Sequence, residues 1–95
     1  MTVARLYIMH ARESAEMESA LEALADAVRA VPGCEGVEML RDLGNEKRFI
    51  FIEKWVSEEA HKDAGKVLPK EALATLQAAL DGPPDGAYFD YLKVV

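Results

Sequence analysis

Several residue types that mark large classes of protein are scarce in this chain. The single cysteine, Cys34, cannot form an internal disulfide, so a reducing cytoplasm is the simplest compartment. Lysine and arginine total 11 against 17 acidic residues, and a charge of −6 without a basic stripe argues against a nucleic-acid partner. No apolar run approaches the roughly 20 residues that span a bilayer, and no signal-peptide pattern begins the chain. We therefore expect a cytoplasmic protein that binds neither nucleic acid nor membrane.

The usual signatures of metal and nucleotide chemistry are missing as well. The two histidines and the cysteine are far apart in sequence, so the ligand spacing of a zinc site is absent. There is no glycine-rich phosphate loop and no Gly-x-Ser-x-Gly turn. We expect no metal and no other cofactor.

The composition that remains is that of one globular domain over residues 1–95. Apolar residues make up 51% of the chain and charged residues 29%, which is ordinary for a folded protein. A chain of this length buries roughly 60–65% of the surface that it exposes when unfolded. Because the core is modest, pairing is a common source of further stability.

Hydrophobic periodicity predicts a strand and a helix in the first third of the chain. Residues 3–9 alternate as a strand does. Ser14 offers an N-cap for the helix that follows, and Pro32-Gly33 ends it. Its apolar residues recur at steps of three and four: Met17, Ala20, Leu21, Leu24, Val28 and Val31.

The rest of the chain predicts a hairpin, two further helices and a last strand. In order, we expect a strand over 35–43, a polar turn over 44–47, a strand over 48–56, a helix capped by Ser57 and ending near Gly65, a helix from Pro69 to Leu80, a loop over 82–86 and a strand over 87–95.

This order of elements predicts a ferredoxin-like α+β fold, an antiparallel sheet with its helices on one face. The strand over 48–56 is apolar on both sides, because Phe49 and Phe51 alternate with Ile50 and Ile52. A sheet of this kind cannot leave one face in water without a large apolar patch. We therefore expect a homodimer in which two sheets pack face to face, by a face that the sequence does not identify.

Residues 49–61 are the most informative segment for function. Glu53 and Trp55 share one face of the strand, and Ser57 begins a helix that carries His61 one turn later. The tryptophan, the carboxylate and the histidine are thereby brought close together. Such residues could make a pocket for an aromatic substrate.

The run Glu53-Lys54-Trp55, followed by Ser57-Glu58-Glu59-Ala60-His61, resembles the antibiotic biosynthesis monooxygenase family. Weaker matches precede it at Pro32-Gly33-Cys34 and at Arg48-Phe49, and the resemblance covers nearly the whole chain. It implies a dimeric α+β barrel and cofactor-independent oxidation of a small quinol- or anthrone-like aromatic by O₂. Some relatives instead bind and degrade haem, or act on other small carbonyl compounds.

The chain departs from parts of that pattern. Relatives similar to it carry a second histidine three residues after the first, where this chain has Ala64. Haem-degrading relatives have a first-strand asparagine and a haem-ligating histidine about ten residues past the tryptophan. Tyr7 or Met9 and Gly65 stand at those places here, which argues against haem degradation.

The residues and the resemblance together suggest a set of site residues. We expect Trp55 to hold an aromatic ring, His61 to accept a proton and Tyr7 to stabilise an oxyanion, as catalytic residues. The expected substrate contacts are Arg5, Met9, Phe51 and Glu53, with Arg5 as an alternative to Tyr7 for the oxyanion.

Each of these residues also has a structural interpretation. Trp55 can be core packing, His61 an exposed helix residue, and Glu53 one half of an ion pair with Arg5 or Arg41. The alternative function is a non-catalytic module that binds a hydrophobic metabolite, or a stress-response module, on the same dimeric barrel. Haem binding is a third hypothesis.

Overall fold

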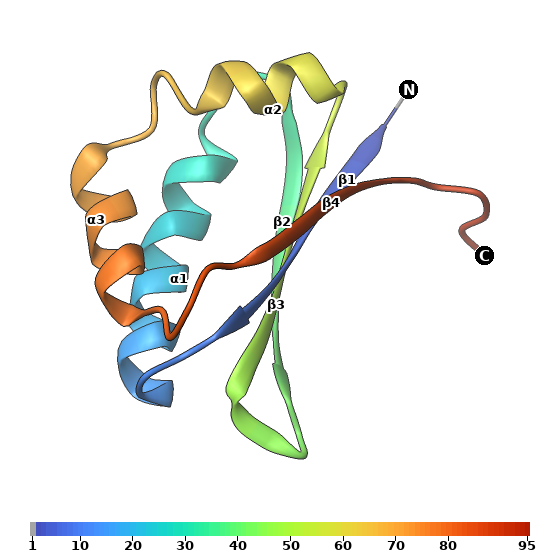
Figure 1. Cartoon of the computed structure of the whole chain (residues 1–95). Coiled ribbons are helices and arrows are strands. Elements are labelled where there is room, and N and C mark those ends of the chain that lie inside the picture. The colour runs from blue at the N-terminus through green and yellow to red at the C-terminus, as the bar shows by residue number, and fades with distance from the viewer. Residues whose placement is uncertain (1) are drawn as a thin grey trace.

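The chain folds into one antiparallel sheet with all of its helices against one face (Figure 1). The structure is a computed structural model that describes residues 2–95. Its elements are β1 (Val3–His10), α1 (Ser14–Arg29), β2 (Cys34–Asp42), β3 (Asn45–Trp55), α2 (Glu58–Ala64), α3 (Lys70–Ala79) and β4 (Asp85–Asp90). The four strands lie in the order β2-β3-β1-β4, and every neighbouring pair is antiparallel. The predicted ferredoxin-like α+β fold is confirmed.

The turn between β2 and β3 is tighter than predicted. The sequence indicated a turn over 44–47, but β2 ends at Asp42 and β3 already begins at Asn45. The carboxylate of Asp42 accepts a hydrogen bond from the backbone N–H of Gly44, at 2.7 Å. This side-chain bond closes the turn over fewer residues, so pairing extends further toward it.

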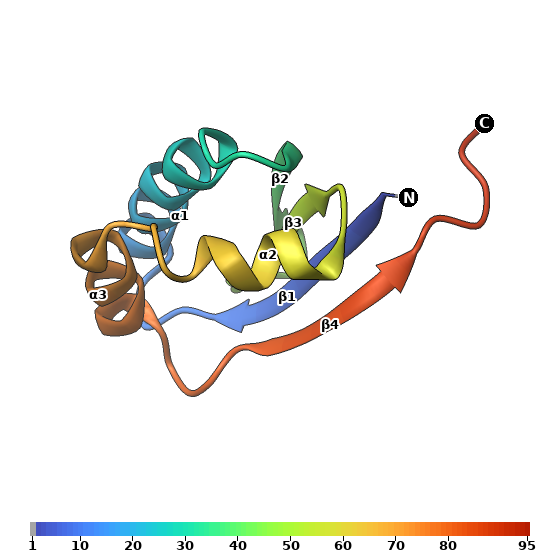
Figure 2. The ribbon, with the colours of Figure 1, turned by 90° about the horizontal axis from the view of Figure 1, so that it is seen from above.

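The last strand is also shifted toward the N-terminus of its predicted range. It was expected over 87–95, whereas β4 runs from Asp85 to Asp90. Among the strands that the structure describes, β4 pairs with β1 alone, and the final pair of that ladder joins Val3 to Asp90. Residues 91–95 therefore extend past the start of β1 and pair with no described strand (Figure 2).

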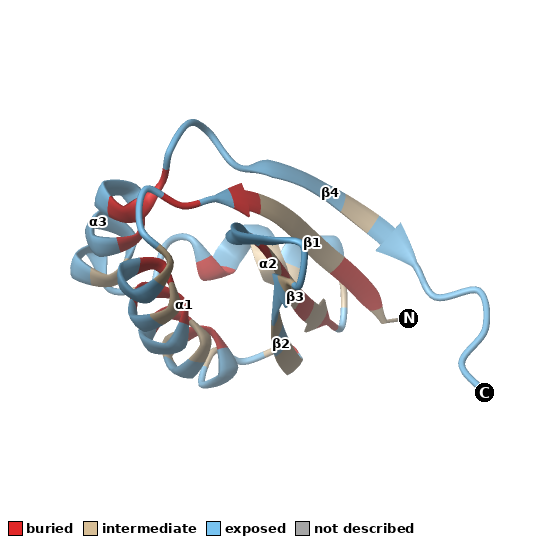
Figure 3. Cartoon of the chain, turned by 90° about the horizontal axis from the view of Figure 1, so that it is seen from below, coloured by how far each residue is buried: buried red, intermediate tan, exposed pale blue. Residues whose placement is uncertain are grey.

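The core lies between the sheet and α1. The buried residues of α1 are Met17, Ala20, Leu21, Leu24 and Val28, which confirms the predicted stripe. They join Phe49, Phe51 and Trp55 of β3 in one apolar cluster, which Figure 3 shows as buried segments facing one another. Burying each large apolar side chain contributes about 1.5–3 kcal/mol. Ser14 is the first helical residue rather than the N-cap, because the carbonyl of Glu13 accepts the first helical bond from Met17.

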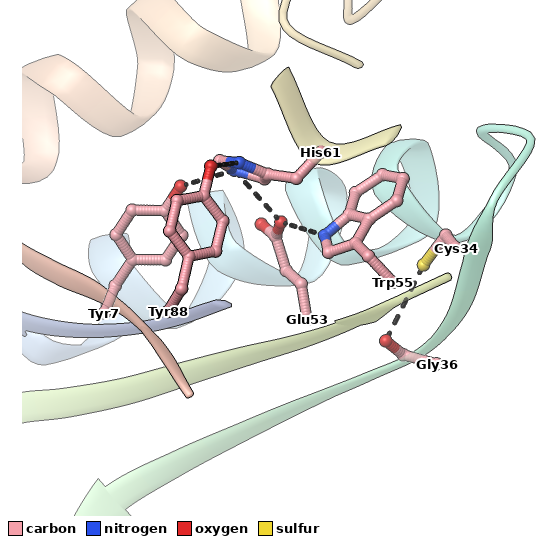
Figure 4. A network of polar contacts seen from close by, with 7 residues as sticks. All are labelled: Tyr7, Cys34, Gly36, Glu53, Trp55, His61 and Tyr88. Carbon is pink, nitrogen blue, oxygen red and sulfur yellow. Dashed lines mark hydrogen bonds and ion pairs between the residues drawn. The ribbon is translucent and has the colours of Figure 1, made fainter. Parts of the chain in front are cut away.

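The short helix α2 is fixed at its first turn. The Ser57 hydroxyl accepts a hydrogen bond from the backbone N–H of Ala60 at 3.1 Å, as the predicted cap requires. Gly33 has a φ of 94°, and a Cβ there would lie 2.9 Å from the Ala60 Cβ. This close approach holds α2 near the end of β3, so the next residue, His61, faces the sheet (Figure 4).

The helices leave the other face of the sheet uncovered (Figure 1). The covered face carries Phe49, Phe51 and Trp55, so the open face carries the alternate residues. Cross-strand register places these apolar side chains on the open face: Ala4, Leu6, Ile8, Leu40, Ile50, Ile52, Ala87 and Phe89. Leu40 and Phe89 are 51% and 49% exposed, so this face is a sizeable apolar patch on the single chain.

Candidate active site

A cavity of about 340 Å³ lies between the sheet and the helices. It is at the small end of the range of about 300–1,000 Å³ that is typical of ligand pockets. Besides Lys62, three polar side chains line it: Tyr7 from β1, Glu53 from β3 and His61 from α2. The remaining lining is mainly apolar and comprises Met9, Leu24, Lys62, Ala64, Gly65, Leu68, Leu73, Leu76 and Pro84. An apolar body with one polar end would match this cavity.

A larger groove between α1 and α3 offers no comparable chemistry. Its volume is about 730 Å³, and alanines form most of its lining together with Glu16, Ser19 and Thr75. It contains no histidine, tyrosine or buried carboxylate. The smaller cavity is therefore the candidate site.

His61 is the centre of the polar cluster in the cavity (Figure 4). Its Nε2 lies 2.9 Å from the hydroxyl oxygen of Tyr7, and its Nδ1 lies 2.6 Å from the hydroxyl oxygen of Tyr88. Its ring also meets that of Tyr88 edge to face, with centroids 5.3 Å apart. Both ring nitrogens are thus bonded to tyrosines from the two neighbouring strands β1 and β4.

Glu53 lies beneath this histidine and is 4% exposed. Its Oε1 accepts a hydrogen bond from the indole Nε1 of Trp55 at 2.9 Å and is 3.7 Å from Nε2 of His61. In the sheet register, Arg5 on β1 stands directly opposite Glu53. One carboxylate therefore has a neutral donor on its own strand and a cation on the next.

Burial is the largest cause of the pKa shifts of Glu53 and His61. It raises the pKa of Glu53, although the Trp55 hydrogen bond and the Arg5 charge lower that pKa in part. It lowers the pKa of His61 to about 4, helped by the positive charges of Arg5 and Lys62. The imidazole is neutral at pH 7, so its contact with Glu53 is not an ion pair.

Residues 1–66 match the family described as antibiotic biosynthesis monooxygenase. The chain belongs to this family. The expectation drawn from the Glu53–His61 run is thereby confirmed. No curated protein sequence matches the chain significantly.

Solved structures share the fold of this family member over almost the whole length of both chains. SnoaB, a cofactor-independent oxygenase from Streptomyces nogalater, is 18% identical with a TM-score of 0.87, covering 99% of this chain and 96% of its own. Rv0793 from Mycobacterium tuberculosis is 18% identical with a TM-score of 0.82, covering 99% and 98%. A conserved protein from Methanosarcina mazei Go1 is 15% identical with a TM-score of 0.82, covering 94% and 91%. At these identities the likeness establishes the fold.

Four of the seven residues predicted for a site of this family's kind line the cavity. They are Tyr7, Met9, Glu53 and His61. Their meeting in space follows from strand alternation and from the cap at Ser57, both of which are visible in the sequence.

The other three predicted residues lie behind the cavity. Trp55 and Phe51 are completely buried in the core. Trp55 reaches the site through its bond to Glu53 and through an edge-on contact with the His61 ring, with centroids 5.8 Å apart. The Arg5 guanidinium lies 4.9 Å from the ring centroid of Tyr7 and 4.4 Å from that of Tyr88. These side chains support the groups that line the cavity.

Sequence reasoning did not include Tyr88 in the site. It lies beyond residues 1–66, and its contact with His61 depends on the register of β4 against β1. The leucines of α1 and α3 were predicted as core, but Leu24 and Leu76 also line the cavity. Residues 88 and 91 fall on opposite faces of an alternating strand, so the sequence left open which tyrosine, Tyr88 or Tyr91, faces the helices.

The remaining sequence predictions concern metals, membranes and Cys34. Among residues 2–95, no group of three or more His, Cys, Asp or Glu side chains is placed to hold a metal ion. No helix in the described part of the chain is long and apolar enough to cross a membrane. Cys34 is buried, its thiol contacts the carbonyl of Gly36 at 3.6 Å, and burial raises the pKa of that thiol.

Proposed function

We propose that the chain is a cofactor-independent monooxygenase that oxidises a small aromatic quinol or anthrone with O₂ in the cavity over Glu53. The observation that carries this proposal is the convergence of a buried carboxylate and a tyrosine hydroxyl at one end of an apolar cavity. Membership of the antibiotic biosynthesis monooxygenase family supports it. SnoaB, which shares the fold, is a cofactor-independent oxygenase.

The chemistry asks little of the protein once the substrate is deprotonated. For an anthrone, the carbon gives one proton to a base, and the resulting anion gives one electron to O₂. The two radicals combine into a peroxide anion, which takes the proton back. Loss of water, including the second hydrogen of that carbon, leaves a carbonyl, so that CH₂ and O₂ become C=O and H₂O.

Glu53 is our proposed proton acceptor. The sequence suggested His61 for this role, but both of its ring nitrogens already hold tyrosine hydroxyls and its pKa is lowered to about 4. Burial raises the pKa of Glu53, which makes its carboxylate a stronger base than an exposed one. Trp55 then acts through Glu53, by its indole hydrogen bond.

Tyr7 and the apolar lining supply binding and charge stabilisation. The Tyr7 hydroxyl is the polar group of β1 in the cavity and can donate to the oxyanion of the substrate. Met9, Leu24 and Leu76 contact the aromatic body and exclude water, which strengthens that hydrogen bond. The small volume favours substrates of about two or three fused rings.

We also propose that two copies pack through the open face of the sheet. That face carries apolar side chains on all four strands, together with the ion pair of Glu38 and Lys54, and the helices leave it bare. Stable interfaces bury roughly 1,600 Å² in total, and the face of a whole sheet can supply its share. Sedimentation at micromolar concentration should give twice the mass of the chain.

The test of the oxygenase proposal is oxygen uptake by metal-free protein with a panel of anthrones and reduced naphthoquinones. Heat-killed protein is the control, because these substrates also oxidise spontaneously. Uptake that depends on the protein, and that falls about 10²–10⁴-fold in Glu53→Gln, is expected. Protein-dependent uptake that Glu53→Gln and Tyr7→Phe both leave unchanged would remove the proposed roles.

A binding module without turnover is the second candidate function. The observation that favours it is that both ring nitrogens of the histidine are already hydrogen-bonded. A histidine whose two nitrogens are satisfied within the chain offers no free lone pair to a substrate proton or to haem iron. A ligand from the same panel that raises the melting temperature without consuming O₂ would favour this function. A Soret band on haem titration would instead support haem binding.

A further inference from the structure

We propose that Tyr88 is a positioning residue of this cavity: its hydroxyl donates to Nδ1 of His61, holds the imidazole with its proton on Nε2, and so leaves the Tyr7 O–H free to donate to a ligand oxygen. This inference deepens the proposed function, on whose cavity it rests. It assigns a role to a residue outside the range that matches the family.

His61 shares a single ring proton between two tyrosines. A neutral imidazole carries one N–H and one lone pair, so one tyrosine must donate to His61 and the other must accept from it. The Nδ1–Tyr88 distance is 2.6 Å, whereas the Nε2–Tyr7 distance is 2.9 Å. Hydroxyl donors make the shorter bonds, and N–H donors cluster at about 2.9–3.0 Å. The distances therefore favour Tyr88 as donor and Tyr7 as acceptor.

The charges around the imidazole ring favour the same tautomer. Oε1 of Glu53 lies 3.7 Å from Nε2, so a lone pair on Nε2 would stand close to a carboxylate oxygen. An N–H there is attracted to it instead. Burial raises the pKa of Glu53, and Arg5, which stands opposite it in the register, offsets part of that rise by favouring the ionised carboxylate. The other cation near the ring is Lys62 on α2, and its positive charge disfavours a second proton on the imidazole.

The tautomer of His61 decides how the Tyr7 hydroxyl can bond to a ligand. Tyr7 lines the cavity, whereas Tyr88 does not. Because the Tyr7 oxygen accepts the Nε2–H, its own proton is not used by His61. If the tautomer were reversed, Tyr7 would donate to Nε2 and could offer a ligand only a lone pair. The chain Tyr88–His61–Tyr7 therefore decides whether the cavity presents a donor or an acceptor, and it makes the site selective for a ligand oxygen such as an aromatic ketone or oxyanion.

The tautomer can be measured without any substrate. In ¹⁵N-labelled protein at pH 7, long-range ¹H–¹⁵N spectra should show His61 protonated on Nε2 alone, with the exposed His10 as internal reference. Tyr88→Phe should lose this single tautomer, because Tyr7 is then free to donate to Nε2. A proton on Nδ1 in the unmodified protein would overturn the proposal, and so would a Tyr88→Phe protein that keeps the Nε2 tautomer unchanged.

Ligand binding tests the second half of the chain. The probe is 1-tetralone, a bicyclic ketone that only accepts hydrogen bonds, and tetralin is its analogue without the oxygen. Tyr7→Phe and Tyr88→Phe should each weaken 1-tetralone binding about threefold to tenfold and leave tetralin binding unchanged. The double variant should be no weaker than Tyr7→Phe alone, because the two act through one chain.

Tyr91→Phe, outside the sheet and away from the cavity, is the matched control and should bind both probes as the unmodified protein does. Losses that multiply in the double variant would overturn the proposal, since Tyr88 would then act independently of Tyr7. Neither measurement needs O₂ turnover. An inactive protein with the expected tautomer would count against the oxygenase alone, and an active protein with the opposite tautomer against this inference alone.

Discussion

Gly86 lies directly opposite Tyr7 in the ladder between β4 and β1, and the Tyr7 ring fills the space that a side chain at Gly86 would need. A Cβ at Gly86 would lie 2.8 Å from the Arg5 guanidinium and 2.9 Å from the Tyr7 ring. The absence of a side chain on β4 is therefore what allows Tyr7 to stand beside His61.

Gly86→Ala should displace that ring and destabilise the fold by about 1–3 kcal/mol. The measurement is the free energy of unfolding by urea, together with 1-tetralone binding, which should also weaken. Gly36→Ala is the control on another strand, because the nearest atom to its Cβ would be a flexible lysine carbon at 3.8 Å. Equal stability of the two variants would contradict the prediction.

The lowered pKa of His61 predicts that stability falls with acid. The folded protein binds this proton only near pH 4, whereas the unfolded chain binds it near 6.5. The stability is therefore complete above pH 6.5 and is lost as the pH falls toward 4. We expect a loss of about 2 kcal/mol, less than the full shift implies because the ring is partly hydrated.

The variant that checks this loss is His61→Gln, compared with the unmodified protein at pH 7 and pH 4.5. Its free energy of unfolding should fall less over that interval. His10→Gln is the matched control, since that histidine is exposed, and it should behave as the unmodified protein. Glu53 acts in the opposite sense, because its raised pKa costs stability as the pH rises through it. Identical pH dependence in all three proteins would rule out the assignment.

Trp55→Phe should raise the pKa of Glu53 further. The indole N–H is the hydrogen bond that favours the ionised carboxylate, and phenylalanine has no donor. The variant should also lose about 1–3 kcal/mol of stability from packing and from the missing bond. A ¹³C-carboxyl titration of Glu53 gives the pKa directly. Phe49→Leu, a core change on the same strand, should cost stability and leave that pKa unmoved.

Ile52→Lys should separate the proposed dimer into single chains. Ile52 lies near the middle of the open face, where a lysine would remove apolar surface and place a charge at the contact between two sheets. Val67→Lys is the control, because Val67 is 66% exposed and lies outside the sheet. Sedimentation should give the monomer mass only for Ile52→Lys. A monomer in the unmodified protein would remove the dimer proposal itself.

The sequence predicted the fold well because its patterns are local. The stripe from Met17 to Val28, the alternation in β3 and the cap at Ser57 each depend on neighbours within a few residues. The element boundaries that were predicted wrongly depend on contacts that the local pattern does not contain. The end of β4 is set by where β1 begins, and the turn after Asp42 is set by a side-chain hydrogen bond.

The site was predictable only to the level of which face a residue occupies. Alternation put Trp55 and Glu53 on one face of their strand. It could not tell that Tyr7 of β1 shares that side of the sheet, or that Trp55 lies in the core and Glu53 at the cavity. Depth depends on how the helices cover the sheet. The role of Tyr88 could not be predicted from the sequence for a further reason: its contact with His61 joins residues 27 positions apart.

Because Tyr88 is hydrogen-bonded to His61, the imidazole also reports whether β4 has paired correctly with the sheet. Successive side chains of a strand point to opposite faces, so a slip of β4 by one residue would turn Tyr88 away from α2. The resonances of one histidine would therefore report when an edge strand has docked in its native alignment. A refolding experiment that follows His61 would time the completion of the sheet from inside the cavity.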